Sequence, residues 1–217
     1  GDRNTALGTN ALTAQNFTTT TDSYNVGVGF SAGASVTTGV QNTLIGGLAG
    51  DALSTGSSNS VLGYKALSAD TLGSRAVAIG DQALENQNFT SGTDNYNIGI
   101  GYKAGNAITT GVNNTLVGAL AGDALTDADF NTAVGQQALS ADTLGSRSTA
   151  IGFATLSAQN FTTATDSYNV AIGHGAGGSV TTGVENTFIG GISATAVTVG
   201  GANTVLGYNV HPSGSGG

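Results

Sequence analysis

The chain has 217 residues, of which 36 are glycine and only 8% are charged. Five Lys and Arg residues against 13 Asp and Glu residues give a net charge of −8, which excludes the clustered cations that nucleic-acid binding requires. Because the chain contains no cysteine, disulfides, thiol catalysis and cysteine-ligated zinc sites are excluded as well. No apolar run approaches the roughly 18 residues of a membrane-spanning helix, so we expect no membrane span in this chain.

An internal repeat organises the whole sequence. Twelve glycines, each preceded by Leu, Val or Ile, recur along the chain at spacings of 21, 17, 17 and 17 residues, and this series of spacings then repeats. They are Gly8, Gly29, Gly46, Gly63, Gly80, Gly101, Gly118, Gly135, Gly152, Gly173, Gly190 and Gly207. One 21-residue unit and three 17-residue units make up each cycle, which gives blocks at 1–72, 73–144 and 145–216. We predict a single repeat domain over 1–211 and a flexible tail over 212–217.

Each unit has the form Asn-x-x-aliphatic-Gly-x-x-Ala, as in 42–49 and 131–138. The five residues from the Asn position to the glycine predict a short strand, because the residue before the glycine is always β-favouring. In chain order these strands are expected at 4–8, 25–29, 42–46, 59–63, 76–80, 97–101, 114–118, 131–135, 148–152, 169–173, 186–190 and 203–207. Units of this length leave no room for helix pairs. The repeat therefore predicts an all-β, parallel β-solenoid of twelve coils.

The 21-residue units carry a four-residue insertion, Gln-Asn-Phe-Thr, at 15–18, 87–90 and 159–162. Each insertion is followed by an Asp-(Ser/Asn)-Tyr-Asn segment, and loops that recur on one side of a solenoid are where repeat proteins often bind. The aromatic rings could stack on sugars, or they could fold back onto the coil. The candidate ligand-contact residues are Asn16, Phe17, Asp22, Tyr24, Asn88, Phe89, Asp94, Tyr96, Asn160, Phe161, Asp166 and Tyr168.

The two faces of each strand are both apolar. Side chains alternate across a strand, so the residue before the glycine shares a face with the residue two positions earlier. We expect this face, with Ile45 and Thr43 as examples, to form the core of the solenoid. The intervening residue would then point outward and pack against partner chains. This predicted inter-chain stripe includes Leu44, Val61, Leu116, Phe188 and Val205.

Two further columns have structural interpretations. The asparagine recurs in ten of the twelve units and could form a ladder of stacked amides or favour the turn that enters the strand. The recurring glycine predicts a left-handed or crowded corner where a Cβ atom would clash.

The units resemble the head repeats of trimeric autotransporter adhesins of the YadA type, and related repeats of phage tail fibres. The resemblance rests on segments such as 203–207 (Asn-Thr-Val-Leu-Gly) and 148–152 (Ser-Thr-Ala-Ile-Gly), and it covers essentially the whole chain. It implies a left-handed parallel β-roll that assembles as a homotrimer with a structural or adhesive role. The units of this chain are longer than the compact repeats of those heads.

The distribution of the polar residues argues against catalysis. Almost every polar residue has a copy at the same place in another block, whereas an active site needs a unique set of residues. His174 and His211 stand alone in divergent units. We expect a non-enzymatic extracellular rod without cofactor or metal, either a trimer or a stacked filament, with a cell-surface glycan or receptor as its partner. One Asp per loop is too few for calcium.

An ice-binding solenoid is a further alternative. Such a surface needs a regular, exposed threonine array, but the threonine column is interrupted at Val26, Val77, Ile98 and Val170 and is expected to share the core face.

Overall fold

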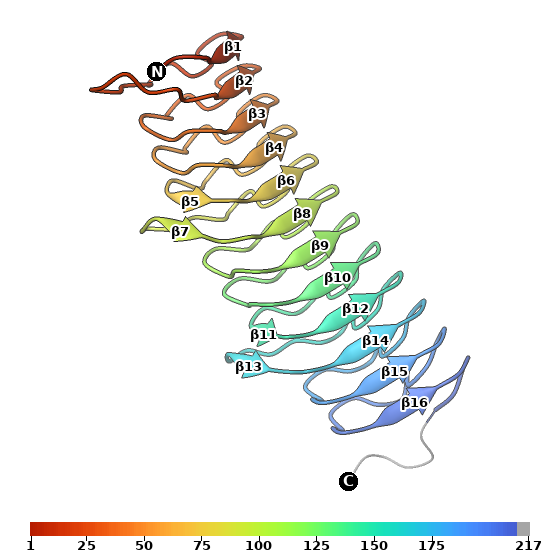
Figure 1. The fold of residues 1–217 in the computed structure, drawn as a ribbon. Coiled ribbons are helices and arrows are strands. Elements are labelled where there is room, and N and C mark those ends of the chain that lie inside the picture. Colours follow the sequence, from red (N-terminus) through yellow and green to blue (C-terminus); the bar gives the residue numbers. More distant parts are fainter. Residues whose placement is uncertain (212–217) are drawn as a thin grey trace. The chain divides into compact units, whose positions relative to one another are not determined.

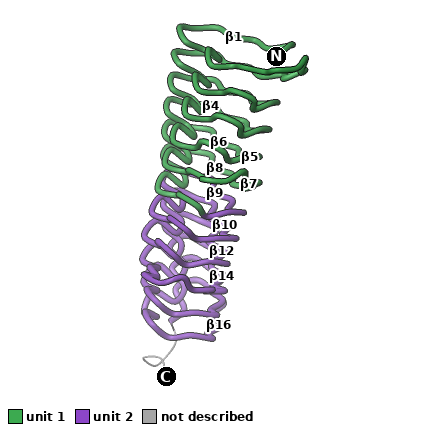
Figure 2. Tube along the Cα trace, turned by 90° about the vertical axis from the view of Figure 1, so that its left-hand side faces the viewer, with its two compact units in different colours: residues 1–110 green, residues 111–217 purple. Residues whose placement is uncertain are grey.

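The computed structural model describes residues 1–211 and is all-β, with no helix in that range. The tail predicted at 212–217 lies outside the described residues. The chain divides into two compact units, unit 1 at Gly1–Thr110 and unit 2 from Gly111 onward. Figure 2 distinguishes them by colour. Each unit is a parallel β-solenoid with six coils, so the predicted fold of twelve coils is confirmed.

In unit 1, six strands of three residues each stack in one parallel sheet, as the stacked arrows in Figure 1 show. They are β1 (Thr5–Leu7), β2 (Val26–Val28), β3 (Thr43–Ile45), β4 (Ser60–Leu62), β6 (Val77–Ile79) and β8 (Ile98–Ile100). Their register follows the repeat without any shift, from Thr5 opposite Val26 to Val77 opposite Ile98. Two shorter strands, β5 (Gly73–Ser74) and β7 (Thr93–Asp94), pair on another side of the coil.

Unit 2 repeats this arrangement. Its six stacked strands are β9 (Thr115–Val117), β10 (Thr132–Val134), β12 (Thr149–Ile151), β14 (Val170–Ile172), β15 (Thr187–Ile189) and β16 (Thr204–Leu206). The short pair consists of β11 (Gly145–Ser146) and β13 (Thr165–Asp166). Because the hydrogen-bonded partner of each residue is the equivalent residue of the next coil, identical positions form columns along each unit.

The prediction of which strand face is internal was wrong. The middle residue of each strand from β2 onward is buried inside the coil, whereas the residues on either side of it face outward. The predicted inter-chain stripe is therefore the core of the solenoid itself: Leu44, Leu116 and Phe188 are fully buried, and Val61 and Val205 are 1% and 6% exposed. Conversely, Leu62 is 48% exposed. Ala6, in β1, is exposed despite its middle position.

The interior is narrow, which explains why most middle residues are small. A Cβ atom added at Gly50 would lie 2.9 Å from the Leu44 side chain, and one added at Gly122 would lie 2.8 Å from Leu116. Phe188 stands in the same relation to Gly177. Where the middle residue is Gly99, the Leu84 side chain fills the space instead. Where the middle residue of the strand is large, the residue facing it inside the coil is glycine, and where the middle residue is glycine, a leucine faces it. The core therefore keeps a constant width.

The recurring glycine forms a crowded corner, as predicted. Gly46 has φ +132°, and a Cβ atom there would lie 2.3 Å from the carbonyl oxygen of Gly63 in the next coil. Since L residues rarely adopt this backbone conformation and no side-chain movement can relieve a contact with backbone, only glycine fits.

The asparagine column forms the predicted amide ladder. Asn42 donates from Nδ2 to the Oδ1 atom of Asn25 at 3.2 Å and to the Gly56 carbonyl at 2.9 Å. Its own Oδ1 accepts from the backbone N–H of Asn59 at 3.0 Å. Asn169, Asn186 and Asn203 repeat the pattern in unit 2. The ladder satisfies buried backbone groups at the start of each strand, so it joins successive coils.

Candidate functional site

Three exposed clusters lie where the 21-residue units bulge outward. In each of them an arginine pairs with an aspartate and lies over a tyrosine ring. The Arg75 Nε to Asp94 Oδ2 distance is 2.9 Å, and the Arg75 guanidinium lies 5.8 Å from the centroid of the Tyr96 ring. The equivalent sets are Arg3, Asp22 and Tyr24 in the first block and Arg147, Asp166 and Tyr168 in the third. We call these the Arg–Asp–Tyr clusters.

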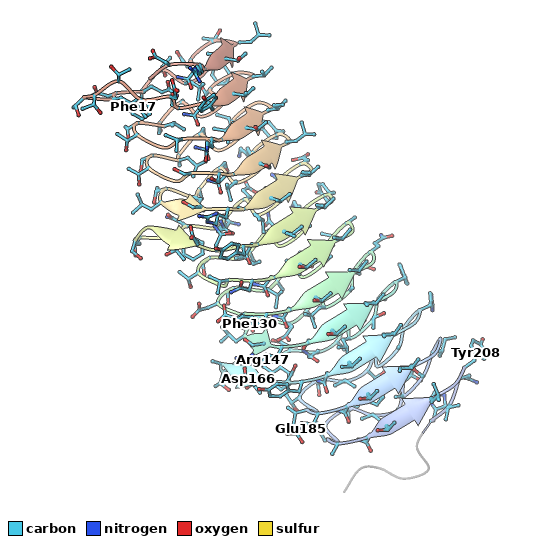
Figure 3. The ribbon with its side chains drawn as sticks, in the orientation of Figure 1. Phe17, Phe130, Arg147, Asp166, Glu185 and Tyr208 are labelled. Carbon is cyan, nitrogen blue, oxygen red and sulfur yellow. The ribbon has the colours of Figure 1, made fainter. Side chains whose placement is uncertain are left out.

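The third cluster has an additional aromatic residue. Arg147 lies 4.7 Å from the centroid of the Phe130 ring as well as 5.9 Å from that of Tyr168. Figure 3 shows Phe130, Arg147 and Asp166 on successive coils at the same side of unit 2. The guanidinium therefore lies close to two ring faces, an arrangement favoured by the ring quadrupole.

Strand pairing in the bulge positions these clusters. In unit 1, β5 pairs with β7 so that Ser74 lies opposite Asp94, which brings Arg75 beside that carboxylate. Arg75 and its two equivalents were not among the residues predicted to contact a ligand. Their signal was their recurrence once in every block together with Asp and Tyr.

The predicted ligand-contact residues fall into two groups. Asp and Tyr of each cluster are at least partly exposed, with Tyr24, Tyr96 and Tyr168 between 45% and 52% exposed. The phenylalanines differ, since Phe89 and Phe161 are only 5% and 6% exposed, and Phe17 is half-buried. The prediction that Phe89 and Phe161 present their rings to a ligand was therefore wrong, because the rings fold back into the coil and add apolar area to its core.

The asparagines that precede these phenylalanines remain at the surface. Asn16, Asn88 and Asn160 are exposed. Asn88 and Asn160 each accept a hydrogen bond through Oδ1, from the hydroxyls of Thr71 and Thr143 at 3.0 Å. These bonds fix the start of each bulge against the preceding coil.

A buried polar cluster lies beneath each of the second and third bulges. Asp70 is fully buried and accepts hydrogen bonds from Gln87 Nε2 at 2.7 Å and from the N–H of Gly73 at 3.0 Å. Gln87 in turn accepts from Asn97. Burial raises the pKa of Asp70, and these donors oppose the rise. Asp142, Gln159 and Asn169 repeat the arrangement, which anchors the insertion and leaves the carboxylate closed to ligands.

The second candidate surface is the outer face of the stacked sheet, formed by the first and third residue of each strand. In unit 1 the third residues are all aliphatic, and Leu7 and Leu62 are 67% and 48% exposed. The first residues are Thr5, Val26, Thr43, Ser60, Val77 and Ile98. Both outward residues are thus aliphatic in β2, β6 and β8, which leaves an apolar surface exposed to water.

In unit 2 the outer face has a different composition. The first residues are Thr115, Thr132, Thr149, Val170, Thr187 and Thr204, and the third residues are Val117, Val134, Ile151, Ile172, Ile189 and Leu206. Every strand except β14 therefore displays one hydroxyl group and one branched aliphatic side chain. All twelve residues are at least partly exposed.

Exposed aromatic residues line the corner beyond the recurring glycine. Phe30, Tyr64 and Tyr102 occupy it in unit 1, and Phe153 and Tyr208 in unit 2, each at least 44% exposed. The rings of Phe153 and His174 stack with centroids 5.2 Å apart. Figure 3 shows Tyr208 at the corner next to β16. This corner extends the apolar character of the outer face.

Within residues 1–211, no group of three or more His, Cys, Asp or Glu side chains is arranged to hold a metal ion. The same part of the chain contains no helix long and apolar enough to cross a membrane. Comparison with family models, curated proteins and solved structures gives no match.

Proposed function

We propose that the chain is a non-enzymatic, structural and adhesive module of an extracellular protein, of the kind found in surface adhesins and tail fibres, and that it works as a homo-oligomer. The observation that carries this proposal is the exposed aliphatic column on the outer face of unit 1. The resemblance to adhesin head repeats supports the same conclusion. The repeated hydrogen bonds of the asparagine ladder also suit a stiff support, because they join each coil to the next.

Self-association would use the outer face of unit 1. This face presents adjacent aliphatic pairs in β6 and β8, with Leu62 of β4 beside them, and carries no charged residue among its twelve outward positions. Monomeric proteins rarely expose a continuous apolar surface of this kind. A second copy of the chain would cover it with an equivalent surface, as closed homo-oligomers do.

Sedimentation analysis of the full chain tests this step. We expect a mass above that of one chain, and we expect Leu62→Lys to shift the population towards the monomer because a buried unpaired ammonium group is costly. Thr55→Lys introduces the same charge at an exposed loop position and should leave the mass unchanged. A wild-type monomer at micromolar concentration would overturn the proposed self-association.

The adhesive role would belong to the Arg–Asp–Tyr clusters. Each presents a half-exposed tyrosine ring beside a carboxylate and a guanidinium, so it offers a stacking surface next to hydrogen-bond donors and acceptors. Hydroxyl-rich ligands such as glycans require this combination. The two clusters of unit 1, one block apart in the sequence, would bind a repeating ligand with avidity.

A glycan array tests this assignment. We expect binding by the wild-type chain and a loss of signal in the triple variant Tyr24→Ala, Tyr96→Ala and Tyr168→Ala. The double substitution Tyr64→Ala and Tyr102→Ala is the control, because these exposed tyrosines lie at the glycine corner and outside the clusters. Equal binding by the tyrosine variant and the wild-type chain would exclude the clusters as the site.

A further inference from the structure

The outer face of unit 2 is a regular two-dimensional array of hydroxyl and methyl groups. The partners in the sheet are Thr115, Thr132, Thr149, Val170, Thr187 and Thr204 in one column, without a register shift. The aliphatic residues two positions later form the second column in the same register. We call these twelve residues the Thr–aliphatic array. The expectation that the threonine column shares the core face was wrong, because the column lies outside the coil.

The spacing of the array follows from β geometry. Neighbouring strands lie about 4.8 Å apart, and alternate residues along one strand lie about 6.6 Å apart. The strands of unit 2 follow one another in this arrangement from β9 to β16 in Figure 1. The array therefore repeats in two directions across the face of one unit.

The hydroxyls of the array are available to a ligand. Within residues 1–211, no protein acceptor is found for the hydroxyls of Thr115, Thr132, Thr149, Thr187 and Thr204. Threonines elsewhere on the coil behave differently: Thr143 donates to Phe161 and Asn160. A row of partly exposed hydroxyls without a protein partner must be hydrogen-bonded by something outside the chain.

The side chains are also held in fixed positions. Val, Ile and Thr are stiff at χ1 because they branch at Cβ. The backbone beneath them is fixed by the asparagine ladder on one side, where Asn186 bonds Asn169 at 3.1 Å, and by the glycine corner on the other. A preorganised surface loses little entropy when it binds a regular partner.

The chemistry of the array selects the class of partner. None of its twelve residues is charged, so it offers no opposite charge to a phosphate, a basic protein or an acidic peptide. A partner must instead present hydrogen-bonding groups at the strand spacing, with room for methyl groups between them. Hydrogen-bonded water oxygens lie about 2.75 Å apart, and tetrahedral angles then place next-nearest oxygens about 4.5 Å apart. That separation is within about 0.3 Å of the distance between strands.

We propose that the Thr–aliphatic array of unit 2 binds the surface of ice. Water molecules bonded to successive threonine hydroxyls take positions close to those of a crystal layer, and the aliphatic column keeps disordered water from the gaps. This inference is independent of self-association through unit 1. The outer face of unit 1 is not expected to bind ice, because the first residues of β2, β6 and β8 are aliphatic and interrupt the hydroxyl column.

Thermal hysteresis and ice-crystal shape in solutions of the full chain test the proposal. We expect the wild-type chain to separate the melting and freezing points and to produce faceted crystals. Thr149→Tyr places a ring that protrudes from the centre of the array and should remove most of the hysteresis. Thr55→Tyr makes the same change at an exposed loop position of unit 1, outside both outer faces, and should leave hysteresis intact.

Circular dichroism and sedimentation of each variant complete the experiment. If Thr149→Tyr alters the melting temperature, Thr132→Lys provides a second test at a neighbouring strand. A wild-type chain with no more hysteresis than an unrelated globular protein would overturn the proposal, and so would equal losses in the Thr149 and Thr55 variants. A change in sedimentation with Thr149→Tyr would also overturn it, since the array would then be an interface between copies.

Discussion

Unit 1 and unit 2 have similar coil interiors but different outer faces. The middle residues of their strands are buried from β2 onward, with Leu44 in the first unit and Leu116 in the second in equivalent surroundings. On the outside, unit 1 has three strands whose outward residues are all aliphatic, whereas unit 2 has one, β14. Because the interior of each unit is filled in a similar way, functional differences between the units should reside in their outer faces.

The glycine corner should be equally essential in both units, with the largest effect of any substitution. An added Cβ atom lies 2.3 Å from a backbone oxygen at Gly46 and 2.6 Å from one at Gly118. We expect Gly46→Ala and Gly118→Ala each to lower the free energy of unfolding by about 4 kcal/mol or more, measured by urea denaturation. Gly92→Ala is the control, because no atom lies within 4 Å of its Cβ position. Tolerance of alanine in one unit would show that the coils are not equivalent.

The middle residues should show the next largest effect. Leu44→Ala and Leu116→Ala remove fully buried side chains from a core that cannot collapse around the gap. We expect each to cost about 3 kcal/mol in the free energy of unfolding. Leu62→Ala, at an outward position, should cost much less in the monomer. If Leu62→Ala proved as costly as Leu44→Ala, the assignment of inner and outer faces would be contradicted.

The asparagine ladder should contribute more at Asn42 in unit 1 than at Asn186 in unit 2. Asn42→Ala and Asn186→Ala each leave a neighbouring strand N–H without its side-chain acceptor, namely that of Asn59 or of Asn203. We expect a loss of about 1 to 3 kcal/mol for Asn42 in chemical denaturation. The effect at Asn186 should be smaller, because Asn203 is only partly buried and water can replace the lost acceptor. Identical losses would argue against this role of burial.

The buried carboxylate of Asp70 predicts a pH dependence. Because burial raises its pKa in the folded chain above the unfolded value of about 3.9, its contribution to stability is fully present below that unfolded pKa and is lost as the pH rises through the higher folded pKa. The free energy of unfolding should therefore fall with rising pH over this interval. Asp70→Asn should flatten the profile there, and an unchanged slope in the variant would refute the assignment.

The smallest effect on stability belongs to the outer faces themselves. Val26→Thr, Val77→Thr and Ile98→Thr together give unit 1 a hydroxyl column like that of unit 2. We expect less than about 0.5 kcal/mol per substitution in the free energy of unfolding, since each side chain points outward and stays β-branched. Sedimentation should show weaker self-association. If the triple variant self-associated as strongly as the wild-type chain, the interface between copies would not be the outer face of unit 1.

Much of the fold was predictable from the repeat. The position of every stacked strand, the asparagine ladder and the glycine corner follow from columns that recur once in each coil. The exposed Asp and Tyr of the bulges were also predictable as surface residues. The inward rotation of Phe89 and Phe161 was not, because an aromatic ring in an insertion suits either the core or a binding surface.

The sequence by itself determined the repeat, its register and its parallel stacking, because a strict period leaves equivalent residues no other partners. Which face of the strand lies inside was decided only by the tertiary structure. Both alternating sets, Leu44 with its column and Ile45 with its column, are apolar, so alternation alone cannot distinguish them. The closed coil distinguishes them by space: Leu44 and Leu116 fit inside because Gly50 and Gly122 lie against them, and the threonines and the other aliphatic column are left outside.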